Sequence, residues 1–194
     1  MADCAGSLTP TPRSEPHFAQ VTAKKTAALT QRGKIGVLLV GDSLVARWPR
    51  DLAPKGSFNF GVGGDRTENV LWRLENARLP PADRAVILVG TNNLRRDEAA
   101  CIADGILAIA QEIATRSKPR KTVVIGILPR RANAKMAEKI VAVNRQLAAA
   151  AGQYRFLDLS ASFNDAVLYL PDGIHLSRSG YETLATTVNA ELQQ

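Results

Sequence analysis

Five short runs of apolar residues recur along the chain, and most show no alternation of apolar and polar positions. The runs cover residues 35–40, 58–61, 85–89, 122–128 and 154–159. Continuous apolar runs of this length are typical of parallel strands that helices cover on both faces. Gly41, Gly90 and Pro129 end three of the runs. The pattern therefore predicts a parallel sheet.

The segments between these runs have a helical period. Apolar residues recur at steps of four, three and four residues over 102–113 and again over 136–147. Residues 18–31 also favour a helix, and Asp65 with Glu68 resembles a capping box at the start of another. The alternation predicts a three-layer α/β/α domain with right-handed crossovers. Ligands of such sheets bind beyond the carboxyl ends of the strands.

The first 16 residues differ in composition from the rest. Three prolines lie there among Ser, Thr and Gly, so we expect a flexible tail over 1–16 and a single domain over 17–194. The chain start does not resemble a secretory signal, because Asp3 comes early and no continuous apolar stretch follows. No apolar run approaches the roughly 18 residues of a membrane span. A cytoplasmic location is the default expectation.

Cysteine usage and charge narrow the range of functions. Cys4 and Cys101 lack the spacing of metal ligands, so we expect two free thiols and neither a disulfide scaffold nor a zinc site. The net charge of +7 favours acidic or phosphate-bearing partners. The arginines are scattered, however, and aromatic residues make up only 5% of the chain, which argues against a nucleic-acid-binding module.

Side chains capable of catalysis follow the strand ends. Ser43 comes just after the first run, where it suits either a nucleophile or a helix N-cap. Asn92 follows the third run and suits an oxyanion donor or an ordinary turn. His17 lies at the edge of the expected tail, which leaves His175 as the available imidazole base. Asp172, three residues earlier, could orient that ring.

A glycine-rich loop, Gly61-Val62-Gly63-Gly64-Asp65, follows the second run. Its G-x-G spacing raises the alternative of a dinucleotide-binding domain. The third glycine is not at the position that this fingerprint requires, and the loop does not follow the first strand. We therefore interpret the glycines as positions where backbone amides approach a ligand closely.

Four blocks of sequence together resemble the GDSL/SGNH hydrolase superfamily over about residues 33–192. They are Gly41-Asp42-Ser43-Leu44, Gly61-Val62-Gly63-Gly64-Asp65, Gly90-Thr91-Asn92-Asn93 and Asp172-Gly173-Ile174-His175-Leu176-Ser177. Within it the chain is most similar to the catalytic α subunits of intracellular platelet-activating factor acetylhydrolase, through residues 59–65, 70–74 and 126–130. The resemblance implies a five-stranded parallel sheet of flavodoxin-like order.

The resemblance also implies a role for each block in a carboxylic ester hydrolase. Ser43 would be the nucleophile, His175 its base and Asp172 the partner that orients His175. The backbone N–H groups of Ser43 and Gly64 and the side chain of Asn92 would form the oxyanion hole. No metal or organic cofactor is implied.

The substrate is less well defined by the sequence. Leu44, Thr91 and Ile174 flank the blocks, so we expect them to line a small acyl pocket that prefers acetyl over long-chain esters. Six arginines follow strand ends or nearly so: Arg47, Arg66, Arg95, Arg96, Arg130 and Arg131. They either attract an anionic ester, such as an acylated sugar or a phospholipid, or form an ordinary solvated face.

One departure from the resemblance leaves the natural substrate open. Residues 164–171 are fewer than in the α subunits, where the corresponding segment borders the site. An O-acyltransferase using the same acyl-enzyme, and a non-catalytic binding module on the same fold, are the alternatives. The α subunits form dimers, so a homodimer is a further expectation.

Overall fold

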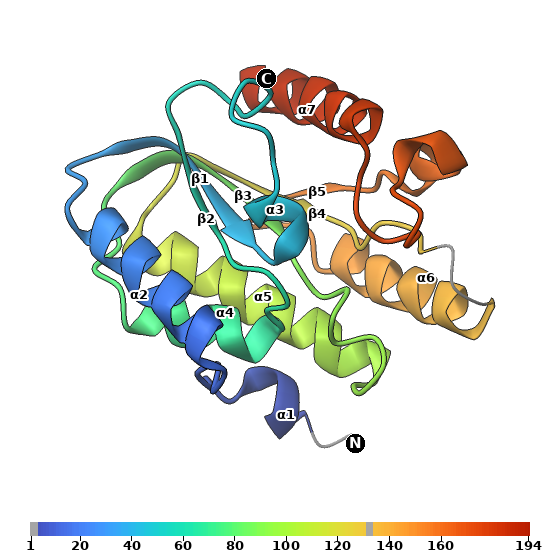
Figure 1. Ribbon diagram of the computed structural model, residues 1–194, viewed down its shortest axis with the longest axis horizontal. Helices are drawn as coiled ribbons and strands as arrows, with labels where there is room; N and C mark the ends of the chain where they lie inside the picture. Colours follow the sequence, from blue (N-terminus) through green and yellow to red (C-terminus); the bar gives the residue numbers. More distant parts are fainter. Residues whose placement is uncertain (1–3, 131–133) are drawn as a thin grey trace.

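The computed structural model describes residues 4–130 and 134–194, which form three layers with one parallel sheet in the middle (Figure 1). Its strands are β1 (Ile35–Gly41), β2 (Ser57–Gly61), β3 (Ala82–Leu88), β4 (Lys121–Ile125) and β5 (Arg155–Leu157), in the order β2-β1-β3-β4-β5. The helices are α1 (Ala5–Leu8), α2 (Pro16–Thr30), α3 (Ser43–Ala46), α4 (Thr67–Glu75), α5 (Ala99–Arg116), α6 (Ala134–Ala149) and α7 (Arg178–Gln193), with 3₁₀ turns η1 (Ser160–Phe163) and η2 (Ala166–Leu168). Within the described ranges, no helix is both long and apolar enough to cross a membrane.

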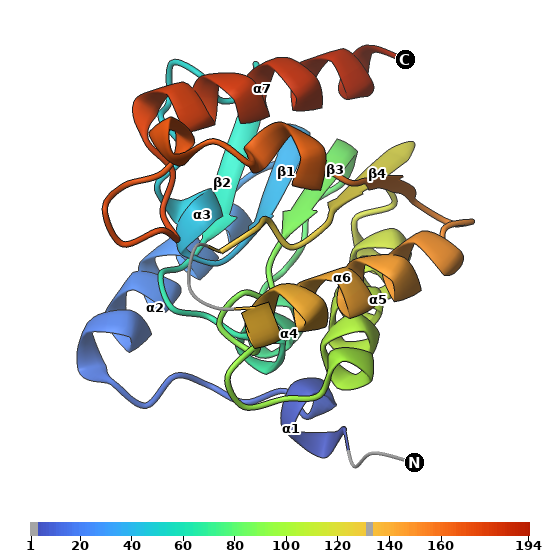
Figure 2. The same cartoon turned by 90° about the vertical axis from the view of Figure 1, so that its right-hand side faces the viewer.

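The strands bury side chains on both faces of the sheet. On β1, Leu38 and Val40 pack toward α2, α4, α5 and α6, whereas Val37 and Leu39 pack toward α3 and α7. Figure 2 shows the four helices on one side of the sheet and α7 on the other. Burying one such side chain contributes about 1.5–3 kcal/mol. Burial on both faces explains why the strands have continuous apolar runs.

The predicted fold class is confirmed, and the differences lie at element ends. β3 begins at Ala82, three residues before the apolar run, because polar residues also pair in the ladder: Arg84 pairs with Val37 and with Lys121. β4 ends at Ile125, although the apolar run continues. Beyond it the N–H of Ile127 donates to the buried side chain of Asn144 at 2.8 Å instead of extending the ladder.

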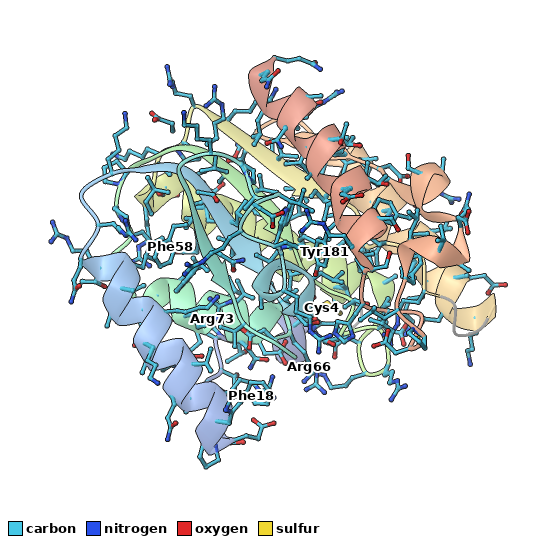
Figure 3. All side chains as sticks on the ribbon, turned by 45° about the horizontal axis from the view of Figure 1, so that its top comes forward. Cys4, Phe18, Phe58, Arg66, Arg73 and Tyr181 are labelled. Carbon is cyan, nitrogen blue, oxygen red and sulfur yellow. A yellow bond between two sulfur atoms is a disulfide. The ribbon has the colours of Figure 1, made fainter. Side chains whose placement is uncertain are left out.

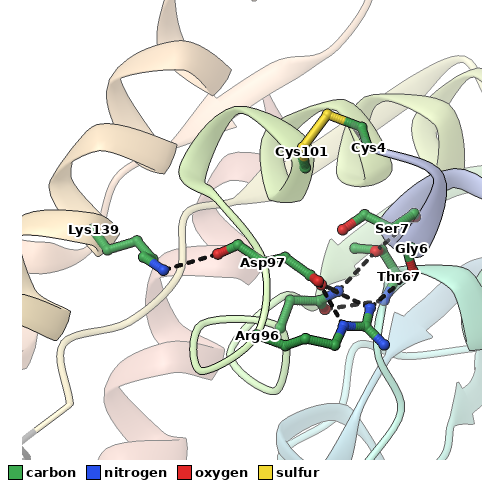
Figure 4. The surroundings of a disulfide bond; sticks show 9 residues. Cys4, Gly6, Ser7, Thr67, Arg96, Asp97, Cys101 and Lys139 are labelled. Carbon is green, nitrogen blue, oxygen red and sulfur yellow. Dashed lines mark hydrogen bonds and ion pairs between the residues drawn. A yellow bond between two sulfur atoms is a disulfide. The ribbon is translucent and has the colours of Figure 1, made fainter. Parts of the chain in front are cut away.

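The N-terminal segment corrects two expectations. Residues 4–15, which we call the N-terminal strap, contain α1 and pack against α4 and α5 where a flexible tail was expected. Cys4 and Cys101 form a disulfide with 4.9 Å between their Cα atoms and a sequence separation of 97 (Figure 4). The expectation of two free thiols is therefore wrong. Spacing gave no signal, because the pairing depends on where the strap packs.

Hydrogen bonds hold the strap as well. The Thr67 hydroxyl donates to the carbonyl of Ser7 at 2.9 Å, and the N–H of Thr11 donates to the carbonyl of Glu68 at 3.1 Å. Arg96 donates to the carbonyl of Gly6 at 2.8 Å (Figure 4). The strap leads directly into α2, which includes His17.

The start of α4 corrects a third expectation. The helix begins at Thr67, and the side chain of Asn69 accepts the N–H of Arg66 at 2.9 Å. Asp65 is therefore not part of a capping box. Its side chain is fully buried and points toward Arg73.

Candidate active site

Ser43 lies at the first position of α3, directly after β1. The carboxylate of Asp42 accepts the N–H of Leu44 at 2.9 Å, which fixes the turn from strand to helix. Gly61 on the neighbouring β2 makes the turn fit, because a Cβ there would lie 2.4 Å from the backbone nitrogen of Ala46. The sequence thus places the Ser43 hydroxyl at the carboxyl edge of the sheet, where ligands of such folds bind.

His175 is presented by a tight loop between η2 and α7. Asp172 Oδ1 accepts the N–H groups of Ile174 and His175, both at 2.9 Å. Gly173 has a φ of +65°, a left-handed conformation that glycine adopts without strain. The carbonyl of His175 accepts the N–H of Leu170 at 2.7 Å, which closes the loop. The three-residue spacing of Asp172 and His175 therefore forms a turn that orients both side chains.

The structure brings these three side chains into one chain of contacts. His175 Nε2 lies 3.0 Å from Ser43 Oγ, and His175 Nδ1 lies 2.6 Å from Asp172 Oδ2. The hydrogen bond with His175 lowers the pKa of Asp172 to about 2, and the two backbone N–H groups act in the same direction. Asp172 is thus ionised at neutral pH, as a partner of an imidazolium must be.

Asp42, beside Ser43, has the opposite electrostatic environment. Complete burial raises its pKa to about 7, although its hydrogen bond from Leu44 opposes that shift. Its Oδ2 atom has no hydrogen-bond partner among the residues that the structure describes. Asp42 therefore stabilises the nucleophile turn through one oxygen and carries a desolvation cost at the other.

The expected oxyanion donors lie on two neighbouring loops. Gly64 has a φ of +75°, and Asn92 donates one amide hydrogen to the carbonyl of Asp65 at 2.8 Å. This bond ties the loop after β3 to the loop after β2 and leaves the second Asn92 amide hydrogen for a ligand. Both residues line a pocket of about 320 Å³ together with Ile174, which precedes His175.

Other expected site residues are distributed differently. Of the three acyl-pocket candidates, Ile174 lines this pocket, whereas Leu44 and Thr91 are buried. Arg66, Arg95 and Arg130 line the pocket, but Arg96 points to Asp97, Glu68 and Gly6, and Arg47 is exposed outside it. Arg131 lies outside the described residues.

A buried arginine that the sequence reasoning missed holds the site together (Figure 3). Arg73 is 1% exposed, and its Nε donates to Asp65 Oδ2 at 2.7 Å. Its other two nitrogens donate to the carbonyls of Phe60 at 2.7 Å and Gly41 at 3.1 Å. The guanidinium thus joins the ends of β1 and β2 to the glycine loop. A usable signal existed, because Arg73 lies three residues after Val70 and shares its apolar helix face.

Asn93 is a second missed residue. It is fully buried, and its side chain accepts the N–H of Thr67 at 3.1 Å and donates to Asp97 at 2.7 Å. These bonds fix the start of α4 against the loop that carries Asn92. The two neighbouring asparagines therefore differ: Asn92 faces the pocket and Asn93 supports the loop.

A parallel α/β sheet with a serine, a histidine and an aspartate in contact at its carboxyl edge defines the class of α/β serine hydrolases. Within this class the chain belongs to the GDSL-like lipase/acylhydrolase family, whose sequence profile matches residues 29–183. Membership of this family makes the chain a carboxylic ester hydrolase, and the resemblance inferred from the sequence is confirmed.

Individual relatives agree with this assignment. Subunit alpha1 of platelet-activating factor acetylhydrolase IB from Bos taurus is 36% identical over 173 residues, which cover 80% of this chain and 74% of the relative. Subunit alpha2 from Rattus norvegicus is 34% identical over 175 residues, covering 81% and 76%.

Solved structures show the same fold. A Streptococcus pneumoniae protein solved under the name of platelet activating factor superposes with a TM-score of 0.77 at 25% identity, covering 90% of this chain and 92% of the other. An acetylxylan esterase from Geobacillus stearothermophilus reaches a TM-score of 0.64 at 16% identity, covering 84% and 94%. The second likeness is one of fold alone.

Proposed function

We propose that the chain hydrolyses short-chain O-acyl esters through an acyl-enzyme on Ser43. The observation that carries the proposal is the 3.0 Å contact between Ser43 Oγ and His175 Nε2, with Asp172 at the opposite ring nitrogen. Free serine is a weak nucleophile, and a base within hydrogen-bond reach is what activates it.

In the first half-reaction, Ser43 Oγ attacks the ester carbonyl carbon while His175 Nε2 takes the hydroxyl proton. The carbonyl electron pair moves to oxygen, which accepts hydrogen bonds from the N–H groups of Ser43 and Gly64 and from Asn92 Nδ2. When the tetrahedral intermediate collapses, the C–O bond to the alcohol breaks and His175 returns the proton to the leaving alkoxide. Water then attacks the acyl-enzyme with the same base, which releases the acid and regenerates Ser43.

The size of the site supports a short acyl group. The pocket beside Gly64 and Asn92 is about 320 Å³ and has to hold parts of both the acyl and the alcohol half of the ester, and three arginine side chains occupy part of its lining. Leu44 and Thr91 are already buried against the protein. Little apolar space is left for a long acyl chain, and the alpha1 and alpha2 relatives are named as acetylhydrolases.

The test is hydrolysis of 4-nitrophenyl acetate, butyrate and octanoate by the wild type and by Ser43→Ala. Ser14→Ala, which changes an exposed serine of the N-terminal strap, is the matched control. We expect Ser43→Ala to lose the activity, Ser14→Ala to retain it, and the rate to fall with chain length. Mass spectrometry of a quenched reaction should find the acyl group on the peptide that contains Ser43.

Each other outcome has a definite meaning. Equal, slow rates in wild type and Ser43→Ala would refute the nucleophile and favour a binding module. Faster cleavage of the octanoyl ester would refute the short-acyl preference. An ester product formed with an added alcohol, at the expense of hydrolysis, would identify an acyltransferase.

Location and assembly also stay predictions. We expect a homodimer from the likeness to the alpha subunits, and sedimentation tests it. The Cys4–Cys101 disulfide argues against the expected cytoplasmic location, because structural disulfides are rare in reducing compartments. Labelling of free thiols in freshly lysed cells would show which form the cell contains.

A further inference from the structure

Three arginines from three different loops gather in the pocket that holds the proposed oxyanion donors. Arg66 follows β2, Arg95 follows β3 and Arg130 follows β4, and with Gly64, Asn92 and Ile174 they line about 320 Å³. Because Ile174 precedes His175 in the chain, this pocket borders the position of a reacting ester carbonyl. Of the six arginines that follow strand ends in the sequence, these three line the pocket.

The three guanidinium groups carry little local compensation. Among the described residues, no carboxylate oxygen lies within ion-pair distance of Arg95 or Arg130, and Arg66 is 4.0 Å from Glu68 Oε1. Glu68 itself has a closer cationic partner, since Arg96 lies 2.8 Å from the same oxygen. Arginines that only cover a surface usually extend into solvent or pair with acids. Arg95 is exposed and the Arg66 side chain is 42% exposed, yet both line the same pocket as Arg130, and among the described residues none of the three has an acid closer than 4.0 Å.

Arg130 is the most constrained of the three. Its Nη1 donates to the carbonyl of Thr91 at 3.0 Å, which holds the side chain over the loop that follows β3. Its Nε is buried and has no hydrogen-bond partner among the described residues. Burial lowers the pKa of Arg130 and the nearby charge of Arg95 lowers it further, whereas the charges of Asp42 and Asp172 oppose that shift without overcoming it. An anionic ligand would accept a hydrogen bond from the buried Nε of Arg130 and would reduce the repulsion between Arg130 and Arg95.

We propose that this pocket binds an anionic group on the alcohol half of the ester, so that the enzyme selects short acyl esters of acidic alcohols. The inference rests on the proposed function: if the acyl group is short and uncharged, the anion must belong to the leaving alcohol. Guanidinium groups bind carboxylate and phosphate oxygens with the same paired N–H geometry. The shared chemistry is therefore an oxyanion, from either a carboxylated or a phosphorylated alcohol.

The experiment uses acetyl esters of three phenols whose para substituents differ in charge. The substrates are 4-acetoxybenzoate, its neutral methyl ester and 4-acetoxyphenyl phosphate, and the measured quantity is the ratio of kcat/KM for each anion to that for the methyl ester. The variants are Arg66→Gln, Arg95→Gln and Arg130→Gln. The matched control is Arg145→Gln, which removes one positive charge from an exposed position on α6, away from the pocket lining.

Because intrinsic ester reactivity is the same for every variant, only selectivity changes the ratio. We expect the ratio to fall about tenfold or more in Arg130→Gln and Arg95→Gln, because each variant loses one charge-assisted hydrogen bond to the anion. Arg145→Gln should keep the wild-type ratio. In wild type, kcat/KM for the anions should fall with ionic strength more steeply than for the methyl ester. The better of the two anions identifies the alcohol class.

Failure of this inference and of the proposed function are distinguishable. Hydrolysis that depends on Ser43, with the same ratio in all three pocket variants and Arg145→Gln, overturns the anion pocket alone and leaves the arginines as a solvated face. Hydrolysis that is equally slow in wild type and Ser43→Ala overturns the proposed function itself. Inorganic phosphate provides a binding readout, because it should inhibit methyl ester hydrolysis competitively in wild type and more weakly in Arg130→Gln.

Discussion

Replacing Arg73 by methionine should be among the most destabilising single changes in this protein. The substitution keeps much of the side-chain volume but removes the guanidinium that contacts Asp65 and two backbone carbonyls. Breaking a buried ion pair by deleting one partner costs about 3–5 kcal/mol. A carbonyl left without a donor adds about 1–3 kcal/mol, although the carbonyl of Gly41 still accepts the N–H of Val62 at 3.1 Å. The sum, about 5 kcal/mol or more, is comparable with the whole stability of an ordinary domain.

The assay is urea unfolding, followed through the fluorescence of Trp48, which is 3% exposed. With an m-value of about 2 kcal/mol/M, a loss of about 5 kcal/mol lowers the midpoint by about 2.5 M. Asp65→Asn and the double variant complete a thermodynamic cycle. The double variant should be clearly more stable than the sum of the single effects implies, because neither charge is then left unpaired.

Two results would refute this reasoning. A midpoint shift below about 0.5 M in Arg73→Met would mean that water or neighbouring groups replace the lost donors. Additive effects in the cycle would mean that Asp65 and Arg73 do not stabilise each other. Arg73→Lys separates charge from geometry, because one ammonium group cannot reproduce the planar fork that reaches all three acceptors. If Lys restores folding but not kcat, Arg73 positions the active-site loops.

Three further predictions concern the disulfide, the nucleophile turn and the oxyanion hole. Reduction of the Cys4–Cys101 disulfide should lower the free energy of unfolding by up to about 4–5 kcal/mol, because the disulfide closes a loop of 97 residues. The unfolding of Cys101→Ala should not respond to reductant. The pKa of Asp42 is raised from 3.8 to about 7 in the folded state, so stability falls as pH rises through that interval. Asp42→Asn should remove this slope and stabilise the protein at pH 8 by up to about 4 kcal/mol, as unfolding across pH would show. Asn92→Ala should lower kcat by about 10²- to 10³-fold, and near-normal turnover would eliminate its role.

The sheet was predictable because both faces of each strand are buried. Leu38 and Val40 pack toward one helix layer while Val37 and Leu39 pack toward the other, so the whole of β1 had to be apolar. Polar strand ends were not predictable in this way. Arg84 pairs in the ladder of β3 through its backbone, and its side chain gives no apolar signal.

The strap and the buried network were missed for a different reason. Cys4 meets Cys101 only because α1 packs on α5, a tertiary contact that local composition does not encode. Asp65 was interpreted as a helix cap because its spacing to Glu68 fits that local pattern. Its actual partner, Arg73, lies eight residues along and turns inward with the apolar face of α4. Local rules favour the nearest polar partner, whereas the fold satisfies carbonyls of Gly41 and Phe60 at the same time.

The positions of these residues suggest how chemistry and specificity are separated in this fold. Buried residues fix the loops that carry the reacting groups. Arg73 binds Asp65 in the loop after β2, and the buried Asn93 fixes the loop that carries Asn92. Two of the pocket arginines lie one or two residues beyond such buried residues, since Arg66 follows Asp65 and Arg95 comes two residues after Asn93. A substitution at these outer positions changes the charge that a substrate meets without removing a buried hydrogen bond. Changes at Arg66 or Arg95 should therefore alter substrate choice at little cost in stability, whereas changes at Arg73 or Asn93 should reduce both stability and turnover.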